Sequence, residues 1–185
     1  LLTTLLHGLA HADQWEDTRE ANLVDGGAPF YGTYRTADDR FVAVGAIEEQ
    51  FFTTLAGGLP CDLSVESQHD RSTWPDTGSR LASIFRNRTR DEWCALLEGT
   101  EACVSPVLAL SEAPDHPQIR DRATFVAVDG VRQPAPAPRF SRTPPPTPVP
   151  GVRDAGAARR ALLAWGLGEE LLADAMANGV LLDPG

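Results

Sequence analysis

The stretch FYGTYRTADDRFVAVG, residues 30–45, is the part of the sequence that predicts local structure most directly. Residues 30–36 and 41–45 are rich in aromatic and β-branched side chains, which favour β-strands. Between them, Ala37-Asp38-Asp39-Arg40 has the composition of a tight connection. We therefore predict a β-hairpin over residues 30–45.

Further elements are predicted on the C-terminal side of this hairpin. Residues 48–57 have a helical apolar face and are closed by glycine and proline, and a helix start at Ser72-Thr73-Trp74-Pro75-Asp76 places proline in the first turn. Thr89 and Glu92 have the spacing of a capping box before a short helix over 93–98. Extended segments are expected at 103–107, 125–128 and 131–132, the last two joined by Asp129-Gly130.

Composition limits the classes of function. With 42% hydrophobic and 23% charged residues and no long apolar run, the chain is expected to be globular and not to enter a membrane. A formal charge of −10 argues against nucleic acid as a partner. All 16 basic residues are arginine, which excludes a Schiff-base or P-loop lysine. The three cysteines have no metal-ligand spacing, and we interpret them as reduced thiols of a cytoplasmic protein.

Both ends of the chain are expected to belong to something other than its central α+β unit. The chain opens at Leu1 without a methionine, and leucines at 1, 2, 5, 6 and 9 have helical spacing. We expect this helix to pack on an upstream part of a longer polypeptide. Residues 134–150 are rich in proline and are predicted to run as an extended strap. Two short helices are expected beyond it, over 157–165 and 169–177.

Sequence spacing alone gives only weak evidence for catalytic or metal-binding residues. His7 and His11 are four residues apart, but no third metal ligand is evident, so no metal site is predicted. Asp25-Gly26-Gly27 is interpreted as a tight turn because it lacks the further glycine of a phosphate-binding loop. Glu48, Glu49 and Asp76 all stand near predicted helix starts, where a carboxylate is also favourable for structural reasons.

Two longer motifs carry a resemblance to a known family. They are residues 21–31, ANLVDGGAPFY, and residues 41–51, FVAVGAIEEQF, and they are followed by Trp74-Pro75-Asp76, residues 103–107 and residues 136–142. Together these motifs cover nearly the whole chain. They resemble the second half of the α-methylacyl-CoA racemases, a branch of the family III CoA-transferases, more than they resemble the transferase branch.

The resemblance implies an architecture that periodicity alone does not give. The family builds a large Rossmann-like α/β domain from both ends of its chain, a small α+β domain from the middle, and an interlocked homodimer. By this resemblance, residues 1–20 would be a connecting helix from the large domain and residues 21–132 the small α+β domain. Residues 133–153 would be a proline-rich return strap, and residues 154–185 would be helices that dock on the large domain.

The resemblance also implies a reaction and site residues. In the racemases a His and an Asp exchange a proton at the carbon α to the thioester, without a cofactor, and both would lie upstream of Leu1. Asp76 takes the position of a Glu that supports this His, and it is one methylene shorter. Leu23 takes the position of a Met that lines the acyl pocket, and Phe51 and Phe52 lie in the segment that closes it. The implied substrate is a 2-methyl-branched acyl-CoA.

Two alternatives to the racemase remain open. A CoA-transferase of the same fold would use the upstream Asp to form a covalent anhydride with the acyl group. A non-catalytic remnant would survive as a dimerisation or acyl-CoA-binding module. In each case the partner of the chain would be the missing half or a second copy.

Overall fold

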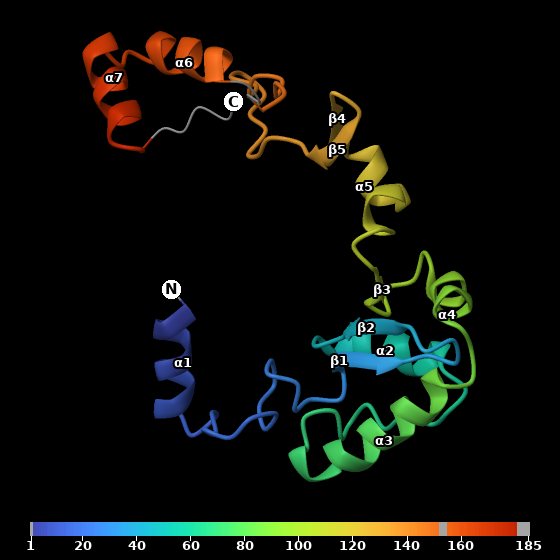
Figure 1. Cartoon of the computed structure of the whole chain (residues 1–185). Coiled ribbons are helices and arrows are strands. Elements are labelled where there is room, and N and C mark those ends of the chain that lie inside the picture. The colour runs from blue at the N-terminus through green and yellow to red at the C-terminus, as the bar shows by residue number, and fades with distance from the viewer. Residues whose placement is uncertain (1, 152–154, 181–185) are drawn as a thin grey trace. The chain divides into compact units, whose positions relative to one another are not determined.

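The hairpin predicted from residues 30–45 lies in a three-stranded antiparallel sheet. In the computed structural model, which describes residues 2–151 and 155–180, β1 (Tyr31–Arg35) pairs with β2 (Phe41–Gly45), with Tyr31 opposite Gly45 and Arg35 opposite Phe41. Strand β3 (Val104–Val107) pairs with the other side of β2, so the order is β1-β2-β3 (Figure 1). The predicted hairpin is confirmed, and β1 is an edge strand.

Three helices cover one face of this sheet. Because side chains alternate along a strand, Val42 and Val44 are buried while Phe41 lies on the opposite face with an exposed fraction of 42%. The helices are α2 (Glu49–Gly58), α3 (Trp74–Phe85) and α4 (Arg90–Leu97). Their fully buried members include Phe52, Leu55, Leu81, Phe85 and Trp93.

Aromatic side chains join the layers of this core. Phe30, just before β1, makes edge-to-face contacts with Phe52 of α2 and Trp74 of α3, at centroid distances of 5.6 and 5.9 Å. Tyr34 of β1 stacks on Phe85 at the end of α3, and burial raises the pKa of its hydroxyl. Each such pair contributes about 0.5–1.5 kcal/mol to stability, in addition to the contribution from the apolar area that it buries.

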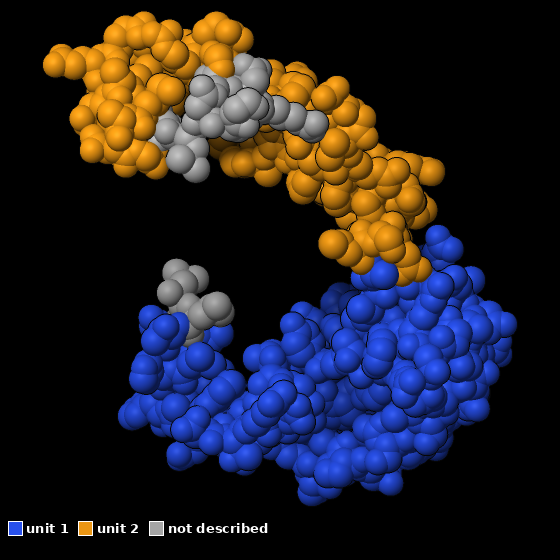
Figure 2. All heavy atoms as spheres, viewed as in Figure 1, with its two compact units in different colours: residues 1–109 blue, residues 110–185 orange. Residues whose placement is uncertain are grey.

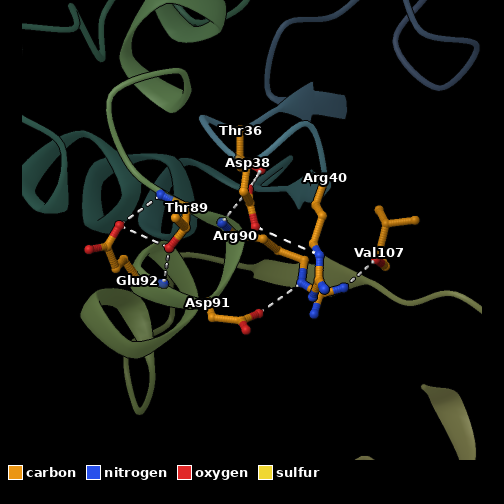
Figure 3. A network of polar contacts seen from close by, with 8 residues as sticks. All are labelled: Thr36, Asp38, Arg40, Thr89, Arg90, Asp91, Glu92 and Val107. Carbon is orange, nitrogen blue, oxygen red and sulfur yellow. Dashed lines mark hydrogen bonds and ion pairs between the residues drawn. The ribbon is translucent and has the colours of Figure 1, made fainter.

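A polar network ties the hairpin turn to α4 and β3 (Figure 3). The Asp38 carboxylate accepts hydrogen bonds from the Thr36 hydroxyl and from the Arg90 backbone N–H, at 2.6 and 3.1 Å. The buried guanidinium of Arg90 donates to the Val107 carbonyl at 3.1 Å and to Asp91 at 2.9 Å. The predicted capping box between Thr89 and Glu92 is present at the start of α4. These hydrogen bonds hold together the β1–β2 turn, the start of α4 and the end of β3, which are far apart in the sequence.

The chain divides into two compact units, residues 1–109 and 110–185 (Figure 2). The second unit contains a 3-10 helix (Ala113–Asp115), α5 (Pro117–Asp121), the hairpin β4 (Phe125–Val128) and β5 (Val131–Pro134), α6 (Ala155–Ala164) and α7 (Glu169–Ala177). Asp129 and Gly130 both have positive φ, as the predicted two-residue hairpin turn requires. Residues 135–151 form neither helix nor strand, as expected for a proline-rich segment, and their role as a return strap stays a prediction.

The N-terminal helix is shorter than the connecting helix predicted over residues 1–20. Helix α1 (Leu2–His11) is followed, two residues after its end, by Asp13, whose φ is +55°. The Asp13 N–H bonds the Ala10 carbonyl, and the Gln14 N–H bonds the Leu9 carbonyl, which is the pattern of a Schellman C-cap. This cap stops the helix before the charged segment 13–20. Along α1, Leu5 and Leu6 are exposed.

The expected α+β class is confirmed by the helices and small antiparallel sheets. The Rossmann-like large domain and the domain boundaries stay predictions, and the boundary between strap and C-terminal segment at 153 and 154 lies outside the described residues. Within residues 2–151 and 155–180, no helix combines the length and hydrophobicity that crossing a membrane demands.

The packing of α3 against the sheet gives a stability prediction. Leu81 is 0% exposed and Leu96 of α4 is 48% exposed. Leu81→Ala should lower the free energy of unfolding by about 2–5 kcal/mol, because the lost methyl groups leave a cavity. Leu96→Ala should change it by about 0.5 kcal/mol or less. Urea denaturation of both variants measures the difference, and equal losses would contradict the core described here.

Candidate functional site

The loop that precedes β1 is organised by one buried amide side chain. Asn22 is 1% exposed, and its side chain accepts from the Glu16 N–H at 2.8 Å and donates to the Glu16 carbonyl at 2.9 Å. It also donates to the Asp25 carboxylate at 2.8 Å. The loop is therefore closed on itself by hydrogen bonds rather than by apolar packing.

Asp25-Gly26-Gly27 is a turn, as the sequence predicted. The Asp25 carboxylate accepts from the backbone N–H groups of Asn22 and Gly27, at 2.8 and 3.1 Å. Gly26 has φ of +103°, and a Cβ on Gly27 would lie 2.7 Å from the Asn22 nitrogen. Both positions therefore require glycine. Desolvation acts to raise the pKa of Asp25, but these hydrogen bonds and one from Ala21 outweigh it and lower the pKa.

This loop forms one wall of a hollow of about 1230 Å³. The other walls are the edge strand β1 with its neighbours Ala43–Gly45 of β2, and one face of α3 from Trp74 to Ala82. Val24, Tyr31 and Trp74 contribute apolar and aromatic surface to the hollow. Glycines at 32, 45 and 78 have no side chains, which leaves more space beside them. The arrangement suits an apolar ligand of some length.

The polar groups of the hollow offer few candidates for chemistry. Glu16 and Glu20 stand on the loop, and Arg71 pairs with Glu16 at 2.8 Å. Cys103 also lines the hollow, but desolvation and the charges of Glu48 and Glu101 raise the pKa of its thiol. A protonated thiol is a poor nucleophile. The hollow thus provides binding surface rather than an activated nucleophile.

None of the site residues predicted from the sequence is among the residues that line this hollow. Asp76 is exposed in the first turn of α3, next to the lining residues Trp74 and Pro75. Leu23 is partly buried against the core, and its neighbour Val24 faces the hollow. Phe51 is partly buried against the same core, and Phe52 is 1% exposed within it. Their roles toward a substrate stay predictions.

Several residues that line the hollow were not predicted from the sequence as site residues. Trp74 and Tyr31 stand inside the motifs that carry the family resemblance, so the motifs were a signal for them. No sequence signal pointed to Arg71 and Glu16, because they are 55 residues apart and meet only in the folded chain. His7 and His11 lie exposed on α1, and the described residues contain no group of three or more potential metal ligands.

Comparison with protein families and curated proteins gives consistent matches. The family model described as CoA-transferase family III matches residues 3–152, which include every residue of the hollow. The chain is 47% identical to α-methylacyl-CoA racemase from Mus musculus over 133 residues, and 42% identical to that from Homo sapiens over 132. Each match covers 70% of this chain and 35% of the relative, so the chain spans about a third of their length.

Two further comparisons agree on the family and the fold. The chain is 37% identical to "CaiB/baiF CoA-transferase family protein ZK892.4" from Caenorhabditis elegans, covering 63% of this chain and 33% of that protein. A mutant form of Rv3272 from Mycobacterium tuberculosis matches 80% of this chain and 40% of its own, with a TM-score of 0.55 and 14% identity. At that identity the structural match shows the fold alone.

The lowered pKa of Asp25 makes the loop sensitive to acid. The folded-state pKa lies below the unfolded value of about 3.9, so ionised Asp25 stabilises the fold above about pH 4. This contribution is lost as the pH falls through the folded-state pKa. Asp25→Asn should therefore be less stable than wild type by a constant amount above about pH 5, and the gap should narrow in more acidic solution. Chemical denaturation across this range measures it; a gap that widens in acid would show that the sign is wrong.

Proposed function

Since the chain belongs to CoA-transferase family III, we propose that it is the C-terminal part of an α-methylacyl-CoA racemase-like isomerase. The observation that carries the proposal is the 47% and 42% identity to two racemases, within a family match that includes the whole hollow. The proposed substrate is a 2-methyl-branched acyl-CoA thioester. The reaction inverts the configuration at the carbon next to the thioester carbonyl.

The proposed chemistry is a 1,1-proton transfer. A thioester carbonyl takes up negative charge as an enolate, which makes the α-hydrogen removable as a proton. One base removes the proton from one face, and an acid on the opposite face returns a proton, so the net atoms and charge are unchanged. We propose that a His and an Asp of an upstream segment do this, and that the reaction uses no metal and no cofactor beyond the CoA of the substrate.

Asp76 is the proposed supporting carboxylate. It stands in the first turn of α3, where the positive end of the helix dipole favours a negative charge. Its side chain is exposed in this chain and is therefore free to contact a residue of another segment. A carboxylate beside an imidazole orients the ring and favours its protonated form. The side chain is one methylene shorter than glutamate, so the imidazole must approach α3 more closely.

The apolar surface of the hollow is the proposed acyl wall. Val24, Tyr31 and Trp74 face the hollow, while Leu23 and Phe51 are partly buried against the core. Phe52 contacts Phe30, which in turn contacts Trp74, so it supports the wall from within. A fatty or steroid-derived chain would be bound here through burial of its apolar area.

The proposed partner of the chain is a second copy or the upstream half of the same polypeptide. Apolar side chains stay exposed on α1, on the outer face of the sheet and on the C-terminal helices, among them Leu5, Phe41, Val107 and Leu171, with exposed fractions of 58, 42, 40 and 58%. Surfaces of this kind are usually covered by another chain or domain. An interlocked homodimer with a Rossmann-like large domain would cover them.

The second candidate is CoA transfer, favoured by the relative from Caenorhabditis elegans whose name includes CoA-transferase. In that reaction an upstream Asp attacks the thioester carbonyl, and CoA leaves as a thiolate. The thiolate then attacks the aspartyl carbonyl of the anhydride, which releases the donor acid and leaves an aspartyl-CoA thioester. The acceptor carboxylate repeats the two steps in reverse, which gives the new acyl-CoA and the free Asp. The two reactions differ in one respect that an experiment detects. Racemisation exchanges the α-hydrogen with solvent, and transfer requires an acceptor carboxylic acid.

The proposal is tested by deuterium exchange. A polypeptide that joins this chain to the upstream segment of its relatives should incorporate solvent deuterium at the α-carbon of a 2-methylacyl-CoA, without added metal, flavin, nicotinamide or pyridoxal. The 185-residue chain alone should not, because it contributes only the supporting carboxylate and the acyl wall. Mass spectrometry of the recovered thioester measures the exchange. CoA transfer to a free acid without exchange would move the assignment to the transferase.

A second prediction concerns Asp76 in the longer polypeptide. Asp76→Ala should lower the turnover number at least tenfold, by a rough estimate, because the imidazole loses its partner. It should lower the free energy of unfolding by about 1 kcal/mol or less. Glu49→Ala, which removes an exposed carboxylate from the first turn of α2, is the matched control and should leave turnover unchanged. If Asp76→Ala affects stability alone, the carboxylate only supports the helix start.

A further inference from the structure

Helix α3 has no side-chain cap of its own, but it continues a 3-10 turn, Arg71–Thr73, which Asp70 caps by accepting from the Ser72 N–H at 3.0 Å. Thr73 occupies the cap position but its side chain makes no capping hydrogen bond, and Pro75 has no N–H to donate. The Asp70 cap acts only within residues 70–73. The contacts of Trp74 and Arg71 with more distant parts of the chain therefore determine where the first turn of α3, and with it Asp76, lies.

Trp74 provides one such contact. It is the first residue of α3 and is 8% exposed. Its indole Nε1–H donates to the Gln68 carbonyl at 2.9 Å, and its ring packs edge-on against Phe30. The Gln68 side chain in turn donates to the carbonyls of Ala46 and Ile47, at 3.2 and 2.8 Å. Through Trp74, the helix start is bonded to the segment that leaves β2.

Arg71 provides a second contact with Trp74. Its guanidinium carbon lies 5.6 Å from the centre of the Trp74 ring, within the range of a cation–π contact. The same guanidinium donates to the Glu16 carboxylate at 2.8 Å and to the Gln14 carbonyl at 3.0 Å. The segment that follows α1 is thereby joined to the start of α3.

We infer that Trp74 and Arg71 are a positioning pair for catalysis, which holds the first turn of α3, and with it Asp76, in place against the hollow. The inference rests on the proposed function, because it assigns the purpose of the pair to the supporting role of Asp76. Both residues line the hollow, so the pair also fixes part of the proposed acyl wall. A displacement of about 1 Å in such a group can cost about a hundredfold in rate.

The chain contains a matched control for Trp74. Trp93 is 0% exposed, and its Nε1–H donates to the Phe85 carbonyl at 2.9 Å. Its ring packs edge-on against Phe85 at 5.2 Å, and the Arg88 guanidinium lies 5.6 Å from it. Trp93 therefore has the same kinds of contact as Trp74, but it belongs to α4 and does not line the hollow.

The experiment compares Trp74→Phe with Trp93→Phe in the longer polypeptide. Each substitution removes one indole N–H and leaves one carbonyl unpaired, so both should lower the melting temperature. Only Trp74→Phe should lower kcat for α-hydrogen exchange, about tenfold or more, with KM within about twofold of wild type. Only Trp74→Phe should speed deuterium uptake at the amides of residues 78–80, which close the first turn of α3.

Arg71 is tested in the same way with two variants. Arg71→Met should lower kcat as Trp74→Phe does, and Arg71→Lys should restore part of the loss, because an ammonium keeps the ion pair with Glu16 but cannot also bond Gln14. Arg88→Met is the control and should leave kcat unchanged.

The outcomes separate this inference from the proposed function. Equal effects of Trp74→Phe and Trp93→Phe on kcat and on deuterium uptake would overturn the pair as a positioning device. Faster uptake in Trp74→Phe with an unchanged kcat would overturn it as well. A wild-type polypeptide without α-hydrogen exchange would refute the proposed function and the catalytic purpose of the pair, while deuterium uptake would still decide whether Trp74 holds the helix start.

Discussion

Burial of one face of the hairpin β1–β2 is the constraint on which the first unit depends. Val42 and Val44 leave water only because α2, α3 and α4 lie over them, and Phe30 and Tyr34 carry the contact to Trp74 and Phe85. The two aromatic contacts place both ends of α3 relative to the sheet. The start of α3 is the end that borders the hollow, so the core and the proposed site share one set of contacts.

The polar contacts have a different function from the apolar ones. Apolar burial is non-directional and holds the layers together, whereas hydrogen bonds specify a single arrangement of their ends. Asn22 and Asp25 shape the loop beside the hollow, Arg90 fixes the hairpin turn to α4 and β3, and Trp74 and Arg71 fix the start of α3. The hollow beside these contacts is lined in part by Val24, Tyr31 and Trp74, which agrees with the proposed acyl-binding role.

The sequence predicted those elements whose cause is local. The β-rich segments of 30–45, the Thr89 capping box and the positive-φ turn at Asp129-Gly130 all depend on neighbours within a few residues, and all are confirmed. The Schellman cap at Asp13, which follows the end of α1 at His11, was not predicted because no glycine marks it. The hollow was not predictable, since Arg71 and Glu16 meet across the fold, and a shift of one residue puts Val24 rather than Leu23 on its wall. The spacing of residues predicts which of them share a face of a helix or strand. It does not predict which other part of the chain packs against that face.

The central claim is that the start of α3 supports a proton carrier that this chain does not contain. A crystal structure of the longer polypeptide with a bound 2-methylacyl-CoA tests it most directly. The account predicts an Asp76 carboxylate oxygen about 2.6–3.2 Å from an imidazole nitrogen of the upstream segment. It also predicts the acyl chain against Val24, Tyr31 and Trp74. An Asp76 side chain that points into solvent, with the acyl chain bound elsewhere, would contradict the claim.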